Sequence, residues 1–304
     1  MSLVEKALRK MQSAPSAAAE LTGNLPRRAP DPVIEKPVPH APPPVSVLPA
    51  HRTDKVVEFN HGMLRSLGLL PVQNEERRFH AEYRQIKRPL IAAARGRGMD
   101  PLPNGRAIMI ASALPNEGKT FTSLNLALSM ALEKDTSVLL VDGDIAKSHV
   151  SRTFGVKEEP GLMDLLLEDS RDIASVILPT TVPGLCLLPS GRDSPTATES
   201  LASARMERIV SELLSRDPTR IVLFDSPPLL LTTESRALAA VVGQTVVVVR
   251  AEETTHKAVL DALACLGEST SVGLVLNQCK TAPSQFYYGY GEYGQSSETG
   301  TDRQ

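Results

Sequence analysis

A run of ten residues, Ala111-Ser-Ala-Leu-Pro-Asn-Glu-Gly-Lys-Thr120, has the residue types that bind a polyphosphate. It follows an apolar stretch, Ala107–Ile110, and precedes a segment with helical character. In the order strand, loop, helix, backbone amides and the helix N-terminus converge on phosphate. Gly118 permits close approach of the backbone, Lys119 can reach the outer phosphates, and the Thr120 hydroxyl can ligate Mg²⁺.

This stretch departs from the pattern G-x-x-x-x-G-K-[ST] at one position, because Ala113 stands where the first glycine is expected. Gly-Lys-Thr also occurs by chance at the start of a helix. The assignment as a phosphate loop therefore depends on motifs that follow it in the chain.

Three aspartates come directly after two other apolar runs. Asp142 and Asp144 follow Val138–Val141, and Asp225 follows Ile221–Phe224 in the form of a Walker B segment. Such carboxylates can hold Mg²⁺ directly or through water, and Asp142 or Asp144 can accept a proton from an incoming hydroxyl. The alternative for the first pair is a helix cap or turn.

The elements that must position these residues alternate between apolar runs and helical patterns. Continuous apolar strands separated by helices indicate a parallel sheet covered on both faces, a doubly wound α/β fold. Right-handed crossovers then place the loops after the strands on one edge. The predicted strands are Ala107–Ile110, Val138–Val141, Leu185–Leu188, Ile221–Phe224, Thr245–Val249 and Val272–Leu276; the predicted helices are Phe121–Leu132, Gly161–Leu167, Glu199–Leu214, Glu234–Val242 and Thr254–Leu266.

Composition excludes several classes of protein. The chain has 304 residues with 33 Lys and Arg against 35 Asp and Glu, so a net charge of −2 gives no case for nucleic-acid binding. Three scattered cysteines suit a reducing compartment without a disulfide or zinc framework. Neither a secretory signal nor an apolar run long enough to span a membrane is evident, so we expect a cytoplasmic protein.

Five regions follow from shifts in composition. Residues 1–12 predict a short amphipathic helix, and residues 13–53 a disordered Pro- and Ala-rich linker. Residues 54–105 read as a helical lead-in, residues 106–281 as the P-loop domain, and residues 282–304 as a flexible Tyr-rich tail. The N-terminal helix is a candidate docking element or a frayed terminus.

Within the lead-in, Glu75–Ala94 predicts one helix, or two around Pro89, with a charged face. That face is either solvated, a subunit contact or a phosphate-facing surface. Its basic residues are Arg77, Arg78, Arg84, Lys87 and Arg88.

Four of the five tyrosines lie in the tail. The cluster is followed by a Gly-, Ser- and Thr-rich end, so the tail is expected to be mobile enough to reach an active site. The alternative is an adhesive aromatic tail without a function in catalysis. The four are Tyr287, Tyr288, Tyr290 and Tyr293.

Taken together, these motifs resemble the bacterial tyrosine kinases of the MinD/ParA-like P-loop superfamily, from about Arg77 to Tyr293. The family's A-x-P-x-x-G-K-T loop is matched by Ala113–Thr120, its D-x-D motif by Asp142-Gly-Asp144, and its third motif by Asp225-Ser-Pro-Pro228. The strand that ends in asparagine in the family is similar to Gly273-Leu-Val-Leu-Asn277.

The resemblance implies a set of roles for these residues. Lys119, Asp142 and Asp144 would be catalytic, and Thr120, Asp142 and Asp225 would hold Mg²⁺. The tail tyrosines would be phosphorylated by a neighbouring subunit, and the added charge would repel and release an oligomer. The residues that would hold ATP are Pro115, Asn116, Glu117, Gly118, Lys119, Thr120 and Phe121, with Asn277 at the adenine.

At three positions the sequence differs from the motifs of the family or its superfamily. The extra lysine of MinD and ParA would fall at Leu114, which favours the kinase branch. In the family's oligomerisation helix, E-x-x-R-x-x-R, Ala81 takes the place of glutamate when the motif is aligned on Arg84 and Lys87. An arginine that often follows D-x-D is replaced by Ala146, and Lys147 is a candidate substitute for it.

The chain looks most like exosortase-associated tyrosine autokinases of exopolysaccharide export. Three features carry this likeness: the segment Glu82–Pro89, the N-terminal helix and the missing membrane spans. That likeness implies a homo-oligomer that reaches the inner membrane only through a partner, a chain-length-determinant or polysaccharide co-polymerase protein that activates it. We therefore predict an ATP- and Mg²⁺-dependent tyrosine autokinase. The alternatives are a MinD/ParA-like ATPase switch without kinase activity and a catalytically silent scaffold.

Overall fold

The computed structural model describes residues 55–97, 101–267 and 271–279, all within the unit Leu48–Gln304 of the chain. The N-terminal helix, the linker and the tyrosine-rich tail expected from the sequence lie outside these residues. Those assignments and the domain boundaries stay predictions. Within the described residues, no helix has both the length and the apolar content that crossing a bilayer requires.

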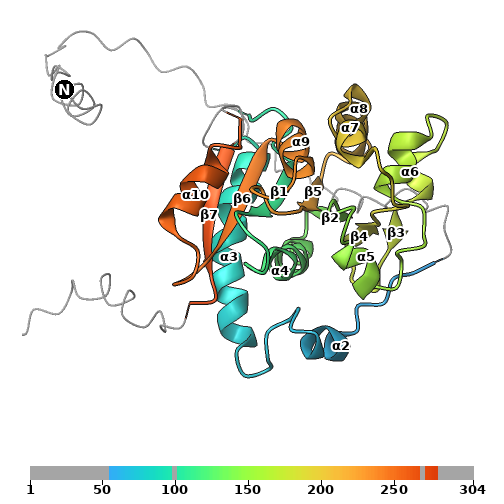
Figure 1. The fold of residues 1–304 in the computed structure, drawn as a ribbon. Coiled ribbons are helices and arrows are strands. Elements are labelled where there is room, and N and C mark those ends of the chain that lie inside the picture. The colour runs from blue at the N-terminus through green and yellow to red at the C-terminus, as the bar shows by residue number, and fades with distance from the viewer. Residues whose placement is uncertain (1–54, 98–100, 268–270, 280–304) are drawn as a thin grey trace, which may run out of the picture. The chain divides into compact units, whose positions relative to one another are not determined.

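Seven strands form one sheet with the order β3-β4-β2-β5-β1-β6-β7 (Figure 1). Neighbouring strands are parallel throughout, except that β3 pairs antiparallel with β4 at one edge. The predicted doubly wound, mostly parallel α/β fold is confirmed. The strands are β1 (Ala107–Ser112), β2 (Ser137–Asp142), β3 (Leu178–Pro179), β4 (Leu185–Leu188), β5 (Arg220–Asp225), β6 (Gln244–Arg250) and β7 (Ser271–Asn277).

Apolar side chains of the central strands pack on both faces of the sheet, which is why these strands read as continuous apolar runs. In β1, Ile108 and Ile110 belong to one core, whereas Met109 belongs to the opposite one. The first core packs against α2 (His61–Ser66), α3 (Glu76–Ala94), α4 (Lys119–Ala131) and α5 (His149–Thr153); the second packs against α6 (Leu162–Leu167), α7 (Ala197–Leu201), α8 (Ala204–Ser215), α9 (Glu234–Val241) and α10 (His256–Leu263).

Helix α3 is one continuous helix although it contains Pro89. Proline removes one backbone hydrogen bond from a helix interior and normally kinks or ends it. Tyr83, Lys87 and Ala93 are buried on either side of Pro89, so tertiary packing supports the helix across that position.

The segment Glu199–Leu214, predicted as one helix, is divided between α7 and α8. Ser203 has an extended backbone at the junction, and its hydroxyl donates to the Ser200 carbonyl at 2.6 Å. Serine side chains that bond to nearby backbone compete with helical hydrogen bonds, which explains the break.

Strand β7 differs from the other apolar strands because it lies at the edge and pairs only with β6. Its predicted run was expected to be buried. The side chains of Val272, Leu274 and Leu276 are instead 41%, 58% and 62% exposed. An edge position therefore leaves apolar surface uncovered within the described part of the chain.

The basic face predicted for α3 is not uniform, because Lys87 is buried against α4. Its ammonium group donates to the Ser129 carbonyl at 2.6 Å and pairs with Glu133 at 2.8 Å. Arg84, one turn earlier, is exposed. Lys87 therefore joins two helices of one subunit and does not lie on the exposed surface that a subunit contact needs.

Replacing Lys87 with methionine is expected to lower the stability of the chain. The substitution removes a charge-assisted hydrogen bond at a buried site, which contributes about 1–3 kcal/mol. The melting temperature would fall by about 2–4 °C for each kcal/mol in a domain of this size. Arg84→Met is the matched control and should leave the melting temperature unchanged; equal values for both variants would contradict this role of Lys87.

Candidate active site

The loop between β1 and α4 has the geometry of a phosphate loop. Asn116 and Gly118 both have positive φ angles, 63° and 95°, and Gly118 caps the N-terminus of α4. A Cβ atom at Gly118 would lie 2.0 Å from the Asn277 amide nitrogen, so only glycine fits there. The loop amides and the first turn of α4 therefore form a site for an anion.

Two side chains hold this loop in place. Glu117, 2% exposed, accepts a hydrogen bond from the Leu114 amide at 2.6 Å and another from the Thr254 hydroxyl. Asn277, at the end of β7, donates to the Glu117 carbonyl at 2.9 Å. The predicted contact of Asn277 with adenine stays a prediction; the contact observed here is with the loop.

The three predicted aspartates meet because their strands are neighbours. Asp142 and Asp225 end β2 and β5 and are partners in the sheet register. Asp225, 1% exposed, accepts hydrogen bonds from the hydroxyls of Thr120 at 2.8 Å and Ser123 at 2.9 Å. The Walker B carboxylate is thereby joined to the first turn of α4.

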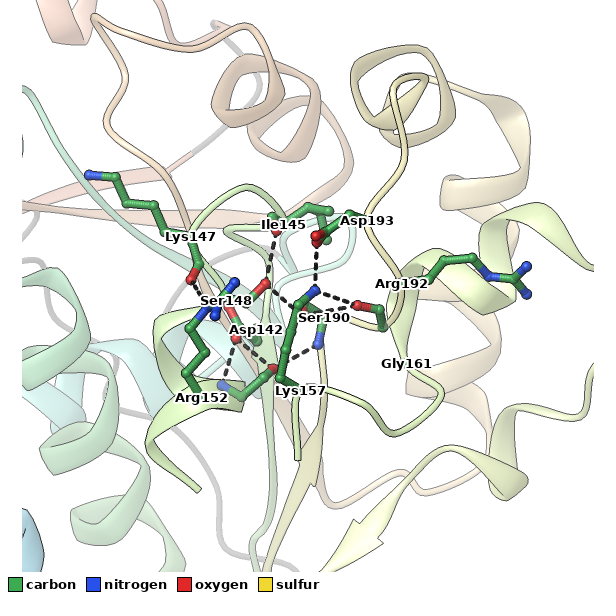
Figure 2. A network of polar contacts seen from close by, with 12 residues as sticks. Asp142, Ile145, Lys147, Ser148, Arg152, Lys157, Gly161, Ser190, Arg192 and Asp193 are labelled. Atoms are coloured by element: carbon green, nitrogen blue, oxygen red, sulfur yellow. Dashed lines mark hydrogen bonds and ion pairs between the residues drawn. The ribbon is translucent and has the colours of Figure 1, made fainter. Parts of the chain in front are cut away.

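Asp142 and Asp144 differ in their surroundings, and Figure 2 shows those of Asp142. Asp142 is fully buried, and its Oδ2 atom accepts from the Ser151 amide at 2.7 Å and the Ser151 hydroxyl at 2.6 Å. Asp144 accepts from the Lys147 amide at 3.1 Å and lines the cavity beside the phosphate loop. Asp144 therefore has direct access to that cavity, whereas Asp142 is not among its lining residues.

Burial shifts the ionisation of the charged groups at this site. Burial, together with the nearby Asp225 and Asp144, raises the pKa of Asp142 to about 7, against the hydrogen bonds from Ser151. Burial also raises the pKa of Asp225, whereas the Thr120 hydroxyl and Lys119 oppose that rise. Burial lowers the pKa of Lys119, whereas the negative charges of Asp225 and Asp144 oppose that decrease. The site therefore favours a further positive charge among its carboxylates.

A cavity of about 300 Å³ lies over the loop. Six of the eight residues predicted to hold the nucleotide line it. The other two, Glu117 and Asn277, instead hold the loop in its conformation. Larger cavities exist elsewhere, such as one of about 590 Å³ between α3 and β7, but Glu82 is the only charged side chain among the described residues that line it. The lining of the cavity at the loop is Leu69, Pro115, Asn116, Gly118, Lys119, Thr120, Phe121, Asp144, Lys147 and His149.

The side chains present fit a nucleoside triphosphate with Mg²⁺. The Oδ1 atom of Asp142 is buried without a hydrogen-bond partner among the described residues, and the hydroxyl and carboxylate oxygens of Thr120 and Asp225 are ligands that Mg²⁺ prefers. In residues 55–97, 101–267 and 271–279, no three His, Cys, Asp or Glu side chains form a protein cage for a metal. That arrangement suits an ion that keeps water and phosphate oxygens as ligands.

Sequence reasoning missed the hydroxyl groups that hold the carboxylates. Ser123 bonds to Asp225, Ser151 bonds to Asp142, and Thr254 bonds to Glu117. Serine and threonine are common, and no spacing in the sequence distinguishes these three. The predicted phosphoacceptors Tyr287, Tyr288, Tyr290 and Tyr293 lie outside the described residues.

Several known proteins with similar sequences or structures are named as tyrosine kinases. The putative tyrosine-protein kinase EpsB of Ralstonia nicotianae is 34% identical over 190 residues, which are 62% of this chain and 24% of EpsB. The tyrosine-protein kinase YwqD of Bacillus subtilis is 29% identical over 69% of this chain and 85% of its own. The kinase domain of the Escherichia coli tyrosine kinase ETK has a TM-score of 0.51 at 27% identity, covering 61% of this chain and 72% of that domain.

The chain spans about a quarter of the length of EpsB. A family model described as an AAA domain matches residues 105–266, more than half of the 304 residues. This range contains the phosphate loop and all three aspartates of the site. The chain therefore belongs to the AAA domain family, and its nucleotide-binding region is similar to those of bacterial tyrosine kinases.

Proposed function

We propose that the chain is an ATP- and Mg²⁺-dependent protein-tyrosine kinase that phosphorylates its own C-terminal tyrosine cluster between subunits. The observation that supports this most is the convergence of the phosphate loop with Asp142, Asp144 and Asp225 at one edge of the sheet. The names of EpsB, YwqD and ETK support tyrosine as the acceptor. The tyrosine-rich tail supplies acceptors in the same chain.

The loop would bind the phosphates through its amides, with Gly118 allowing the close approach. The Lys119 ammonium group would stabilise the charge that develops on the transferred phosphoryl group. The Thr120 hydroxyl and Asp225, which already bond to each other, would hold Mg²⁺. When bound, Mg²⁺ would neutralise charge on the β- and γ-phosphates.

Asp142 would accept the proton of the tyrosine hydroxyl, assisted by Asp144. A raised pKa of about 7 suits a general base that works near neutral pH, because such a group can both take up and release a proton. Asp144 lies on the cavity wall, where an incoming tyrosine would meet it first. Asn variants of each aspartate would separate the two roles.

We further propose that the chain assembles as a homo-oligomer, is cytoplasmic, and lies at the inner membrane through an activating membrane partner in exopolysaccharide export. The resemblance to exosortase-associated autokinases supports this setting. The predicted amphipathic helix at residues 1–12 is a candidate contact for that partner. Phosphorylation of several tyrosines would add roughly −1.5 to −2 charges each and favour release of subunits.

Transfer between subunits is tested by mixing two variants of the chain. One is the full-length Lys119→Met chain, and the other is an active chain without residues 282–304. With Mg-ATP, phosphotyrosine should appear on the tail of the Lys119→Met chain, as measured by mass spectrometry. A Lys119→Met chain that carries phenylalanine at all four tail tyrosines is the control and should stay unlabelled.

Other outcomes of this experiment favour the rival functions. Hydrolysis of ATP by the unaltered chain without any modified tyrosine would support the ATPase switch and contradict the kinase. Absence of ATP binding at millimolar concentration would support a catalytically silent scaffold.

A further inference from the structure

Three serines without any exposed surface form a hydrogen-bonded network with Asp142. Figure 2 shows two of them, Ser148 and Ser190, beside Asp142. Ser148 and Ser151 lie on the chain that follows β2, and Ser190 lies in the loop that follows β4. Because β4 is the neighbour of β2 in the sheet, these two loops meet at the same edge. Hydroxyl groups that are fully buried must find partners within the protein.

Ser151 bonds to Asp142 with both of its donors. Its amide and its hydroxyl donate to the same carboxylate oxygen, Oδ2, at 2.7 and 2.6 Å. The other oxygen, Oδ1, is buried and has no hydrogen-bond partner among the described residues. Two donors on one oxygen fix the rotation of the carboxylate, so the free oxygen keeps one direction.

Ser190 in turn fixes Ser151. The Ser190 amide donates to the Ser151 hydroxyl oxygen at 2.9 Å, so that hydroxyl accepts one bond while its proton is committed to Asp142. The hydroxyls of Ser190 and Ser148 bond to each other at 2.8 Å. Ser148 has a positive φ of 48°, an uncommon conformation that surrounding contacts must maintain.

The loop that carries Ser190 is itself anchored from two sides. Lys157, just past α5, bonds to the Gly191 carbonyl at 2.8 Å and to Asp193 at 2.7 Å. Asp164 in α6 accepts from Arg192 at 2.6 Å. The position of Ser151 is therefore set by contacts that extend well beyond β2.

We propose that Ser151 is a positioning residue that holds Asp142 so that its Oδ1 atom is available for the reaction, with Ser190 locking Ser151 in place. This inference rests on the proposed function of Asp142. It goes beyond that function because it names the group that orients the carboxylate. The expected consequence is that loss of the Ser151 hydroxyl slows the chemical step without weakening the binding of Mg-ATP.

The test compares Ser151→Ala, Asp142→Asn and the double variant in the full chain. For Ser151→Ala, kcat for tyrosine phosphorylation should fall by about 10- to 100-fold, the range seen when partners that orient a functional ligand are removed. The dissociation constant of a fluorescent ATP analogue with Mg²⁺ should stay within about threefold. In the Asp142→Asn background, Ser151→Ala should change the residual rate by less than about twofold, because Ser151 acts through Asp142.

Ser137→Ala is the matched control, because Ser137 begins the same strand and its hydroxyl donates to Asp217 at 2.5 Å. It should leave kcat unchanged whatever it does to the melting temperature. An undiminished kcat in Ser151→Ala, or an equal loss with and without the Asp142 carboxylate, would overturn the inference. If the unaltered chain phosphorylates tyrosine, either of these results contradicts only the role of Ser151 and does not contradict the proposed kinase function.

If the unaltered chain hydrolyses ATP without labelling tyrosine, the kinase proposal fails and the same comparison is made on the hydrolysis rate. The Asp142 carboxylate would then accept a proton from water. Ser151→Ala should again lower the rate only when the Asp142 carboxylate is present. If the unaltered chain shows neither reaction, the proposed function and this inference are both overturned.

Discussion

Replacing Lys119 with methionine is expected to lower the rate of tyrosine phosphorylation by at least about 10²- to 10³-fold, the cost of removing one group that stabilises developing charge. Lys119 is 9% exposed, lines the cavity, and lies near Asp225 and Asp144. Methionine keeps the length and the apolar part of the side chain but not its charge. The measurement is the initial rate of phosphotyrosine formation with Mg-ATP.

Lys147→Met is the matched control for this variant. Lys147 lines the same cavity, but its side chain is exposed, so water already screens its charge. We expect less than about a tenfold loss in rate. An undiminished rate in Lys119→Met would contradict the active-site assignment, and an equal loss in both variants would contradict a special role for Lys119.

Replacing Asp142 with asparagine is expected to lower the phosphorylation rate by about 10²- to 10⁴-fold, the usual contribution of a general base. Asparagine has nearly the same shape, and its carbonyl oxygen can still accept both bonds from Ser151. The fold should therefore persist while proton transfer is lost. Asp144→Asn, measured in parallel, would show whether the aspartate on the cavity wall contributes as much.

The same variant should stabilise the chain in the absence of nucleotide and Mg²⁺, and the gain should depend on pH. Burial raises the pKa of Asp142 from 3.8 to about 7. A raised pKa means that the stability contributed by the neutral carboxyl is present below pH 3.8 and is lost as the pH rises through about 7. Asparagine does not ionise, so it avoids that loss.

The expected result is a melting temperature higher than that of the unaltered chain by a few °C at pH 8, since about 1 kcal/mol corresponds to roughly 2–4 °C. The difference should shrink as the pH is lowered to 5.5. Thermal unfolding at the two pH values, with metal removed by a chelator, provides the measurement. If the variant is less stable at both pH values, the pKa of Asp142 is not raised by burial in the folded chain.

The elements of the sheet and the main parts of the site could be predicted from the sequence. A strand buried on both faces needs a continuous apolar run, so β1, β2, β4, β5 and β6 are each visible locally. The polar residues after three of them follow because all parallel strands end at one edge. The sequence left open whether Pro89 divides α3, and packing keeps it as one helix. The single helix predicted over Glu199–Leu214 was less exact, because a serine divides α7 from α8.

What only the tertiary structure decided is which polar side chains hold the functional ones. Lys87 reads as one more charge on a basic helix, yet it is buried against α4, where it donates to the Ser129 carbonyl and pairs with Glu133 just past the end of that helix. Ser151 and Ser190 are 39 positions apart and come together because β2 and β4 are neighbours. Hydrogen bonds of this kind leave no periodic pattern in a sequence, because their geometry depends on how distant segments pack. The sequence alone determined the chemistry of the phosphate loop and its aspartates, and the packing decided how Asp142 is oriented.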